Sequence, residues 1–360
     1  MCFGFLFSDK LLGTVLLKDS RSFKSRTTGE NTDAESNLHY PSTFFGVYHI
    51  NEKASMGLGI FSPFGLKSEW PSDWEGRYIT TSSELKTFNF NPNIAYKIAD
   101  NFNVSVGVDL LYGDAELNQN INFSQLGFSD GYQSFKGDAF GYGFNVGLLY
   151  QVSDDLSLGA SYRSKISLNL DGKSEFTFPQ GTPGFLQANL PNTSGEVSID
   201  LPPQLDLGLA YKFTSELIME VGCKWEGWST YKDLTFQFTQ PINGATSVTQ
   251  PKNWEDSWSF NIGAKYDFSP TYSVVGGYFH AWSAIPDETI EPSVIGADRN
   301  SFSIGLIKSF KRLEVAVSYA VEILEDRTKN NIVGLETGSA ANGEYSQTIH
   351  MLGLSLSYSF

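Results

Sequence analysis

The amino-acid sequence predicts an all-β protein, a transmembrane antiparallel β-barrel of about fourteen strands. Apolar and polar residues alternate with period two along most of the chain, which is typical of strands that have one apolar face and one polar face. Short and long connections between these segments also alternate. No run of about 18 apolar residues is present to form a transmembrane helix, whereas a barrel strand needs only about 9–11 alternating residues.

The alternation is clearest where Phe102, Val104, Val106, Val108 and Leu110 are separated by small or polar residues. Equivalent segments are predicted to be strands because a strand turns successive side chains to opposite faces. The predicted strands lie near 12–24, 42–50, 53–61, 88–96, 102–112, 140–150, 156–162, 205–213, 217–225, 260–268, 272–278, 302–306, 313–321 and 344–360.

Connections of two lengths separate the predicted strands. Their alternation places all the short turns at one end of the sheet, as in outer-membrane barrels, and a soluble β-sandwich gives no reason for it. The short turns lie at 51–52, 99–101, 153–155, 214–215, 269–270 and 310–311. The long loops lie near 25–41, 62–83, 118–137, 173–194, 239–253, 284–297 and 326–343.

The polar faces of the strands carry charges of both signs. If the aromatic-rich faces meet lipid, these charges line a wet lumen, where they are paired or hydrated. On a soluble sheet the opposite face would instead be a large exposed apolar surface. The predicted lumen residues are Asp109, Arg163, Asp206, Lys212, Glu220, Lys224, Glu226, Lys265, Glu314 and Glu322.

Composition argues against nucleic-acid binding and against catalysis. The net charge is −15, whereas nucleic acids attract basic surfaces. Cys2 and Cys223 form no disulfide framework, and the four histidines have no metal-ligand spacing. We therefore predict no metal, no cofactor and no enzymatic activity. Two alternatives remain: an outer-membrane hydrolase with a site built from distant loop residues, and a structural porin.

Residues 59–78, Gly-Ile-Phe-Ser-Pro-Phe-Gly-Leu-Lys-Ser-Glu-Trp-Pro-Ser-Asp-Trp-Glu-Gly-Arg-Tyr, closely resemble the segment after the third strand in the FadL family of outer-membrane long-chain fatty-acid transporters. This family includes the TodX branch, which admits toluene-like hydrocarbons. The final strand, which ends on Phe360, resembles the signal that the barrel assembly machinery recognises. Supporting matches lie at 83–87, 91–96, 137–147, 161–165, 201–203 and 225–229.

The resemblance implies an outer-membrane channel for passive uptake of fatty acids or aromatic hydrocarbons, and we expect it to be a monomer in contact with outer-membrane lipid. It also implies lateral release of ligand through a gap at a kink in the third strand. The matching kink here is Ser62-Pro63-Phe64-Gly65. Proline cannot donate to a ladder, so a pairing break is physically sensible. An ordinary strand end followed by a turn is the alternative.

One feature of the family is not matched. An amino-terminal hatch plugs the barrel in the family, whereas here only residues 1–11 precede the predicted barrel of residues 12–360. We interpret residues 1–11 as the remnant of a plug region. Because the start of the sequence also lacks an export signal, we expect the sequence to be incomplete at its amino terminus.

Two long loops carry apolar side chains that are costly to expose unless they pack together or bind a ligand. In the family the corresponding loops form an initial capture groove, and mutual packing as a lid is the alternative. The candidate ligand-binding residues are Phe64, Gly65, Phe128, Tyr132, Phe135, Phe176, Phe178 and Phe185, with Arg163 facing the lumen.

Arg163 either meets a ligand carboxylate or forms a structural salt bridge. The cations that grip a carboxylate in some family members are not clearly matched, because the fifth strand ends in Glu116-Leu117-Asn118-Gln119. This weakens fatty acid relative to neutral hydrocarbon as the ligand.

Overall fold

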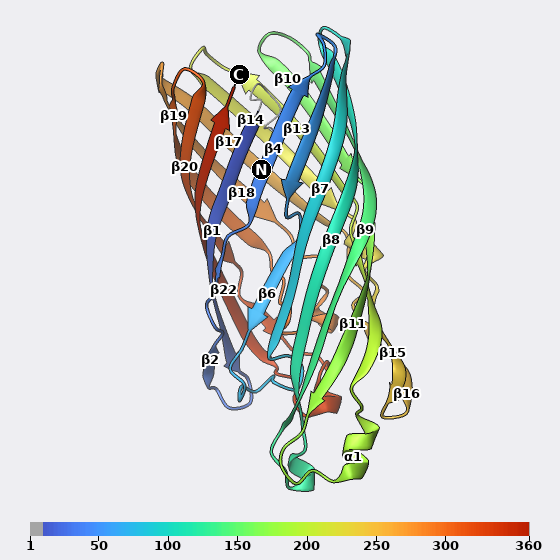
Figure 1. Ribbon diagram of the computed structural model, residues 1–360. Coiled ribbons are helices and arrows are strands. Elements are labelled where there is room, and N and C mark those ends of the chain that lie inside the picture. The colour runs from blue at the N-terminus through green and yellow to red at the C-terminus, as the bar shows by residue number, and fades with distance from the viewer. Residues whose placement is uncertain (1–9, 360) are drawn as a thin grey trace.

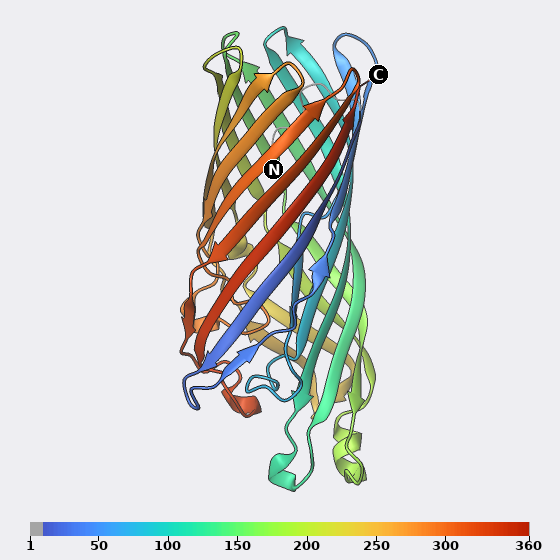
Figure 2. The same ribbon diagram turned by 90° about the vertical axis from the view of Figure 1, so that its left-hand side faces the viewer.

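The computed structural model describes residues 10–359, and its strands form one closed antiparallel sheet (Figures 1 and 2). The barrel closes where β1 (Lys10–Ser25) pairs with β22 (Gly343–Tyr358) along their full lengths. β1 begins two residues before the predicted start at residue 12. Residues 1–9 of the predicted plug remnant, and Phe360 at the other end, lie outside the described residues.

The 22 strand segments make fourteen passes of the wall, as predicted, because several passes are interrupted. The interrupted passes are β2 (Asn31–Asp33), β3 (Leu38–His39) and β4 (Ser42–His49); β5 (Ala54–Phe61) and β6 (Gly65–Glu69); β10 (Leu156–Arg163) and β11 (Ile166–Thr177); β12 (Thr193–Leu201) and β13 (Gln204–Lys212); β14 (Leu217–Glu226) and β15 (Asp233–Ile242); β16 (Ala245–Pro251) and β17 (Ser257–Ser269); and β20 (Leu313–Leu324) and β21 (Arg327–Lys329). The other passes are β1, β7 (Ser82–Ala99), β8 (Phe102–Ile121), β9 (Gly131–Gln151), β18 (Tyr272–Ala281), β19 (Arg299–Ser309) and β22.

Helical segments are short and belong to the connections. The described residues contain no helix that is long and apolar enough to cross a membrane. Figure 1 shows the short turns at the upper end of the barrel and the long loops at the lower end. The segments are η1 (Ser124–Leu126), α1 (Gly184–Asn189), η2 (Trp228–Thr230), η3 (Asp287–Thr289) and η4 (Leu335–Thr337).

Two predicted long loops are largely strand. The predicted loop 118–137 shrinks because β8 continues to Ile121 and β9 already begins at Gly131. The prediction of a loop at 239–253 is wrong, because these residues form the end of β15, the turn at Asn243-Gly244 and β16, which together are a hairpin. Both turn residues have positive φ, as a two-residue type I′ hairpin turn requires. Polar residues on both faces of these segments hid the alternation that marks a strand.

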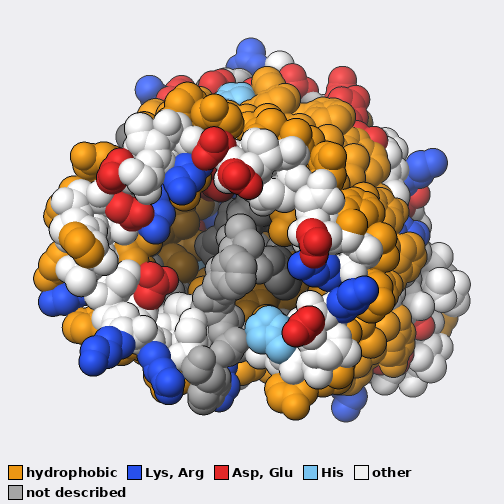
Figure 3. Space-filling model, turned by 90° about the horizontal axis from the view of Figure 1, so that it is seen from above, with side chains coloured by type: hydrophobic (Ala, Val, Ile, Leu, Met, Phe, Trp, Pro, Cys, Tyr) orange, Lys and Arg blue, Asp and Glu red, His pale blue; other side chains and the backbone are white. Residues whose placement is uncertain are grey.

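The two faces of the wall differ as the alternation predicts. On β8, Val106 and Val108 are exposed on the outer face, whereas Gly107 and Asp109, which alternate with them, are buried. Seen from the short-turn end, apolar side chains surround the outside of the barrel and charged side chains gather at its inner rim (Figure 3). The apolar face therefore meets lipid, and the polar face lines the lumen.

Two neighbouring passes break at the same height. Arg163 pairs in register with Gln204, and Ile166 pairs with Leu201. Both pairs face inward, although residues three apart in a regular strand face opposite sides. Residues 164–165 and the facing 202–203 therefore reverse the alternation together.

Candidate functional site

A fully buried carboxylate lies at the centre of the inner wall. Asp109 on β8 accepts hydrogen bonds from the amide nitrogens of Asn89 at 2.6 Å, Asn91 at 3.2 Å and Asn145 at 3.0 Å. Its second oxygen also lies 3.3 Å from Nε of Arg163. Three strands, β7, β9 and β10, thus supply donors to one acceptor on β8, which satisfies the buried charge.

Arg163 belongs to this network. Its ion pair with Asp109 is a structural salt bridge, one of the two roles predicted for this residue. The guanidinium carbon also lies 5.1 Å from the centre of the Phe61 ring, within the range of a cation–π contact. Phe61 is the last residue of β5. The network therefore extends across the inner wall to Phe61, where the pass formed by β5 and β6 is interrupted.

The third pass is interrupted at 62–64, inside the predicted kink Ser62-Pro63-Phe64-Gly65. β5 pairs with both β4 and β7, whereas β6, which begins at Gly65, pairs in the described residues with β7 alone. Across the interruption, the Phe64 amide donates to Oγ1 of Thr87 at 3.1 Å, and the Thr87 hydroxyl donates back to the Phe64 carbonyl. The edge of β6 that faces away from β7 thus has no ladder partner among residues 10–359.

An apolar cluster, here called the lumen cluster, fills the inside of the wall next to this interruption. Phe64 and Phe135, two predicted ligand-binding residues, both belong to it, and Phe64 packs edge-on against Trp228 with ring centres 6.1 Å apart. The buried members are Leu111, Ala115, Phe135, Ala139, Ile166, Leu168, Leu170, Val197, Leu201, Tyr231 and Leu234, with Phe64, Leu85, Leu117, Ile199, Trp228, Phe236 and Trp254 packed against them.

The sequence pattern predicted Phe64 and Phe135 but not the tryptophan and tyrosine members of this cluster. Trp254 packs against Trp228 and Tyr231 with ring centres 4.8 Å and 5.1 Å away. Trp228 and Tyr231 belong to the η2 connection and Trp254 follows β16, so no period-two pattern could assign them to the lumen. The sequence did contain a signal for the Asp109 network, because Asn89 and Asn91 alternate with apolar residues and so share the face opposite to the apolar one.

The remaining predicted ligand-binding residues divide into two groups. Phe128 and Phe178 pack around buried Phe176 in a second cluster, here called the loop cluster, which also holds Phe123, Leu190, Ile121 and Ile242. Phe185 on α1 is 66% exposed, and Tyr132 faces outward. The aromatic residues of these loops therefore pack partly as a lid and leave Phe185 at the tip.

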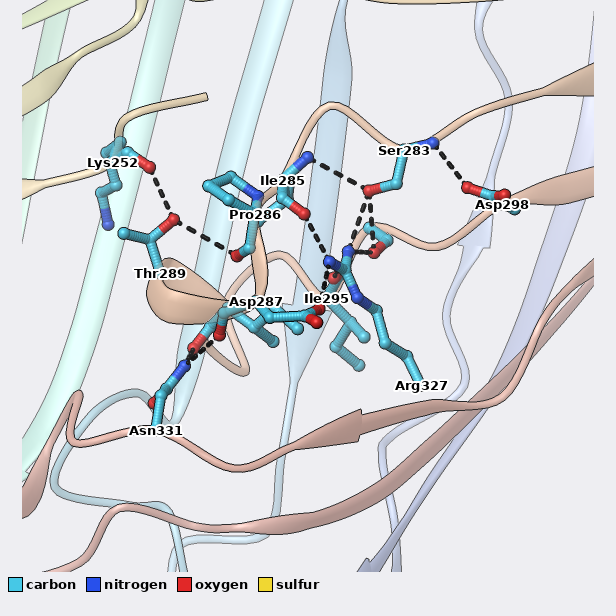
Figure 4. Close-up of polar contacts among 12 residues, drawn as sticks. Lys252, Ser283, Ile285, Pro286, Asp287, Thr289, Ile295, Asp298, Arg327 and Asn331 are labelled. Carbon is cyan, nitrogen blue, oxygen red and sulfur yellow. Dashed lines mark hydrogen bonds and ion pairs between the residues drawn. The ribbon is translucent and has the colours of Figure 1, made fainter. Parts of the chain in front are cut away.

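Two side chains of β21 bind the loops at 282–298 and 330–342, and Figure 4 shows the contacts of the first, Arg327. Arg327 donates to Oγ of Ser283 at 2.9 Å, to the carbonyls of Ile285 and Gly296, and to Asp287. The ammonium of fully buried Lys329 donates to three acceptors in the second loop, which are Val333 O, Ala340 O and Asn342 Oδ1.

Two buried ionisable side chains lie within this loop assembly. Burial lowers the pKa of Lys329 to about 8, although Glu291 and Glu336 act to raise it. Burial acts to raise the pKa of Glu291, but the ammonium of Lys252, a hydrogen bond from Ser293 and the charge of Lys329 together outweigh that effect, so the pKa lies below its usual value. The loops consequently form one packed unit at the long-loop end.

The chemistry of the site is that of apolar contact. Within residues 10–359, no group of three or more His, Cys, Asp or Glu side chains is arranged to hold a metal ion. The interior offers an apolar lumen cluster, a paired carboxylate network and an interrupted strand edge. This arrangement suits the passage of an apolar molecule.

Comparison with known proteins agrees with this arrangement. The "47 kDa outer membrane protein" of Pasteurella multocida is 28% identical over 286 residues, which cover 74% of this chain and 66% of that protein. "Outer membrane protein P1" of Haemophilus influenzae is 23% identical over 356 residues, covering 89% and 75%. The "Long-chain fatty acid transport protein" of an Escherichia coli strain is 22% identical over 339 residues, covering 82% and 73%. The chain thus spans roughly two thirds to three quarters of the length of these curated relatives.

Solved structures share the fold. A Pseudomonas aeruginosa FadL homologue superposes with a TM-score of 0.88 at 19% identity, covering 98% of this chain and 90% of the other. The Pseudomonas putida toluene transporter TodX gives a TM-score of 0.71 at 17% identity, covering 99% and 91%.

A family assignment rests on nearly the whole chain. Residues 14–360 match the family described as "Outer membrane protein transport protein (OMPP1/FadL/TodX)". Members of this family are channels and not enzymes, and they reside in the bacterial outer membrane. The chain belongs to the OMPP1/FadL/TodX family of outer membrane transport proteins.

Proposed function

We propose that this protein lets hydrophobic small molecules pass inward through the outer membrane and releases them sideways at the Ser62–Gly65 interruption. The observation that carries the proposal is the strand edge of β6, which has no described ladder partner on one side and follows Phe64, a residue that packs onto the lumen cluster. An apolar molecule there remains in contact with apolar side chains, which favours it by roughly 25 cal/mol per Å² buried. Passage follows the concentration gradient.

Capture begins at the outward loops. Phe185 and Leu126 are exposed at the loop tips, next to the packed loop cluster. An apolar solute that meets these side chains leaves water before it reaches the lumen cluster. The P. multocida and H. influenzae relatives carry no substrate in their names, whereas the E. coli relative is named for long-chain fatty acids and TodX for toluene.

Neutral hydrocarbons fit this interior better than fatty acids do. Arg163 is paired with Asp109, and Lys252 is paired with Glu291, so a ligand carboxylate would have to compete with a protein carboxylate for either cation. Competition of that kind costs binding free energy. We therefore expect toluene-like ligands to be taken up in preference to oleate.

The test is uptake by host cells that lack their own channel of this kind. Cells that express this protein should accumulate labelled toluene faster than cells with an empty vector. Pro63→Asp places a charge in the interruption and should abolish the gain, while Pro270→Asp, in an exposed short turn, should leave it unchanged. Folding of both variants is checked by heat-modifiable migration on gels. Equal uptake by the two folded variants would refute release at this position.

A structural porin is the alternative. The purified protein would then conduct salt in planar bilayers and show no saturable binding of toluene or oleate. The lumen cluster, which fills the inside of the wall with apolar side chains, argues for the transporter.

A further inference from the structure

A pair of amide side chains separates the loop cluster from the lumen cluster on the inner wall. On β8, Leu117 belongs to the lumen cluster and Ile121 to the loop cluster, and Gln119 lies midway between them. All three side chains face inward, because every second residue of a strand faces the same side. Gln133 on β9 pairs in register with Gln119 and lies at the same level of the wall. Two apolar regions of one wall are therefore divided by glutamines.

The two glutamines form one hydrogen bond and leave other polar atoms without a partner. Nε2 of Gln119 donates to Oε1 of Gln133 at 3.0 Å. Oε1 of Gln119 and Nε2 of Gln133 make no hydrogen bond with residues 10–359, and both atoms remain accessible. An amide oxygen accepts hydrogen bonds and an amide nitrogen donates them. The pair thus offers one acceptor and one donor on the inner face.

Buried hydroxyl groups near the pair also lack partners. Ser174 on β11 pairs in register with Phe135, which lies two residues after Gln133 on β9. Its side chain is buried, and its hydroxyl has no hydrogen-bond partner in the described part of the chain. The same holds for Ser68 on β6, which belongs to the same inward row. Because an unpaired buried polar group costs free energy, this level of the wall favours a molecule that brings hydrogen-bonding atoms.

A ligand that moves along this wall from the loop cluster to the lumen cluster meets the glutamine pair on the way. Toluene has neither a donor nor an acceptor to offer there. A carboxylate only accepts hydrogen bonds, so it leaves the oxygen of Gln119 without a partner. A hydroxyl group both donates and accepts, and it can bind the oxygen of Gln119 and the nitrogen of Gln133 together.

We propose that Gln119 and Gln133 form a selectivity site that recognises the hydroxyl group of hydroxylated hydrocarbons such as p-cresol. The hydroxyl donates to Oε1 of Gln119 and accepts from Nε2 of Gln133, while the ring contacts the apolar side chains of Leu117 and Ile121. The inference rests on the inward passage proposed above and does not depend on where the ligand leaves the barrel.

Concentration-dependent uptake by host cells that lack their own channel of this kind tests the proposal. Initial rates are measured for labelled p-cresol and labelled toluene, and the rates of cells with an empty vector are subtracted. With the unmodified protein, half-maximal uptake of p-cresol should occur at a concentration about fivefold below that of toluene, which corresponds to a typical hydrogen bond.

The double variant Gln119→Met/Gln133→Met replaces both amides by apolar side chains of similar size, so that neither is left without its partner. It should raise the half-saturating concentration of p-cresol and bring the ratio between the two ligands to about one. Gln237→Met is the matched control, since Gln237 is exposed on the outer face of β15, in register with Glu196. The control should keep the fivefold preference.

Folding of each variant is checked by heat-modifiable migration on gels. If the double variant does not reach the folded form, Gln133→Met alone serves as the test. It should raise the half-saturating concentration of p-cresol at least twofold and leave the preference weaker than in the Gln237→Met control.

Two results would overturn the proposal. One is equal half-saturation by p-cresol and toluene in the unmodified protein, and the other is a fivefold preference that survives in the folded double variant. If the protein gives no uptake above the empty vector, the inward passage and this inference fail together. Failure of the release position alone gives a different result, which is equal toluene uptake by Pro63→Asp and Pro270→Asp with the preference for p-cresol intact.

Discussion

The wall of this barrel has two zones that are built in opposite ways. Toward the short turns, the outer face is apolar and the inner face is polar, as Val108 and Asp109 show. Toward the long loops, the outer face carries charges such as Asp114 and Glu116, while the inner face carries Leu111 and Ala115. The outer face follows its surroundings, which are lipid in one zone and water in the other. The inner face is polar where the lumen is wet and apolar where the lumen cluster fills it.

Neighbouring strands pass from one zone to the other in two different ways. β8 and β9 run through both zones without interruption, and only the chemistry of their side chains changes. β10/β11 and β12/β13 break instead at 164–165 and 202–203, where the alternation reverses. Because β9 continues past the break, its register with β11 differs by one residue from its register with β10. A paired break thus lets two strands exchange their faces without losing their mutual register.

The largest effect is expected at the buried carboxylate of the membrane zone. Asp109→Ala removes the acceptor of Arg163 and of three asparagine amides. Breaking a buried ion pair in this way costs about 3–5 kcal/mol. Urea unfolding of the barrel in liposomes, followed by tryptophan fluorescence, measures the loss. A change below about 1 kcal/mol would mean that water enters this part of the wall.

The lumen cluster should respond less strongly. Leu168 is fully buried, and a Cβ added at Gly113 would lie 2.6 Å from its Cδ1 atom, so the two strands meet closely here. Leu168→Ala opens a cavity and should lower the free energy of unfolding by about 2–4 kcal/mol. Leu158→Ala, on β10 of the same pass, faces lipid and serves as the control. Equal losses in both variants would remove the distinction between the zones.

The free energy of unfolding should depend on pH through Lys329 of the loop assembly, with a sign opposite to that of a lysine in an ordinary ion pair. Burial lowers the pKa of folded Lys329 from 10.5 to about 8, so the unfolded chain binds more protons between pH 8 and pH 10.5. Stability should therefore rise with pH across that window. The free energy of unfolding is measured for the unmodified protein and for Lys329→Met across this pH range. Their difference reports Lys329 alone, because the tyrosines titrate in both proteins. A difference that does not vary with pH would contradict the burial of the ammonium.

The smallest effect is expected outside the lipid zone. Asp200 lies 3.0 Å from the ammonium of Lys165, and both side chains are partly exposed on the outer face. Asp200→Ala should change the unfolding free energy by about 0–1 kcal/mol, because water screens such pairs. The same urea titration makes it the matched control for Asp109→Ala. A loss comparable to that of Asp109→Ala would show that the outer face is not solvated there.

Local pattern predicted most of the wall. Alternation over 102–112 placed Asp109 on the inner face, and the short turns were found at the positions where β4 meets β5 and β7 meets β8. The hairpin at Asn243-Gly244 was missed although its turn dipeptide favours a two-residue connection, since β16 carries only Val248 as a large apolar residue and shows no alternation. Phe128, Phe176 and Phe178 were identified as residues of interest, but their mutual packing depends on contacts between separate loops.

The sequence by itself determined the strand count, the face that meets lipid and the end that carries the long loops, because period-two alternation and turn chemistry act within a few residues. Only the tertiary structure decided which inward charges meet, which aromatic rings form the lumen cluster and where the wall is left unpaired. Those features join residues far apart in the chain, as Arg163 with Asp109 and Phe64 with Trp228. Closure of the barrel brings them together, and no local pattern encodes that proximity.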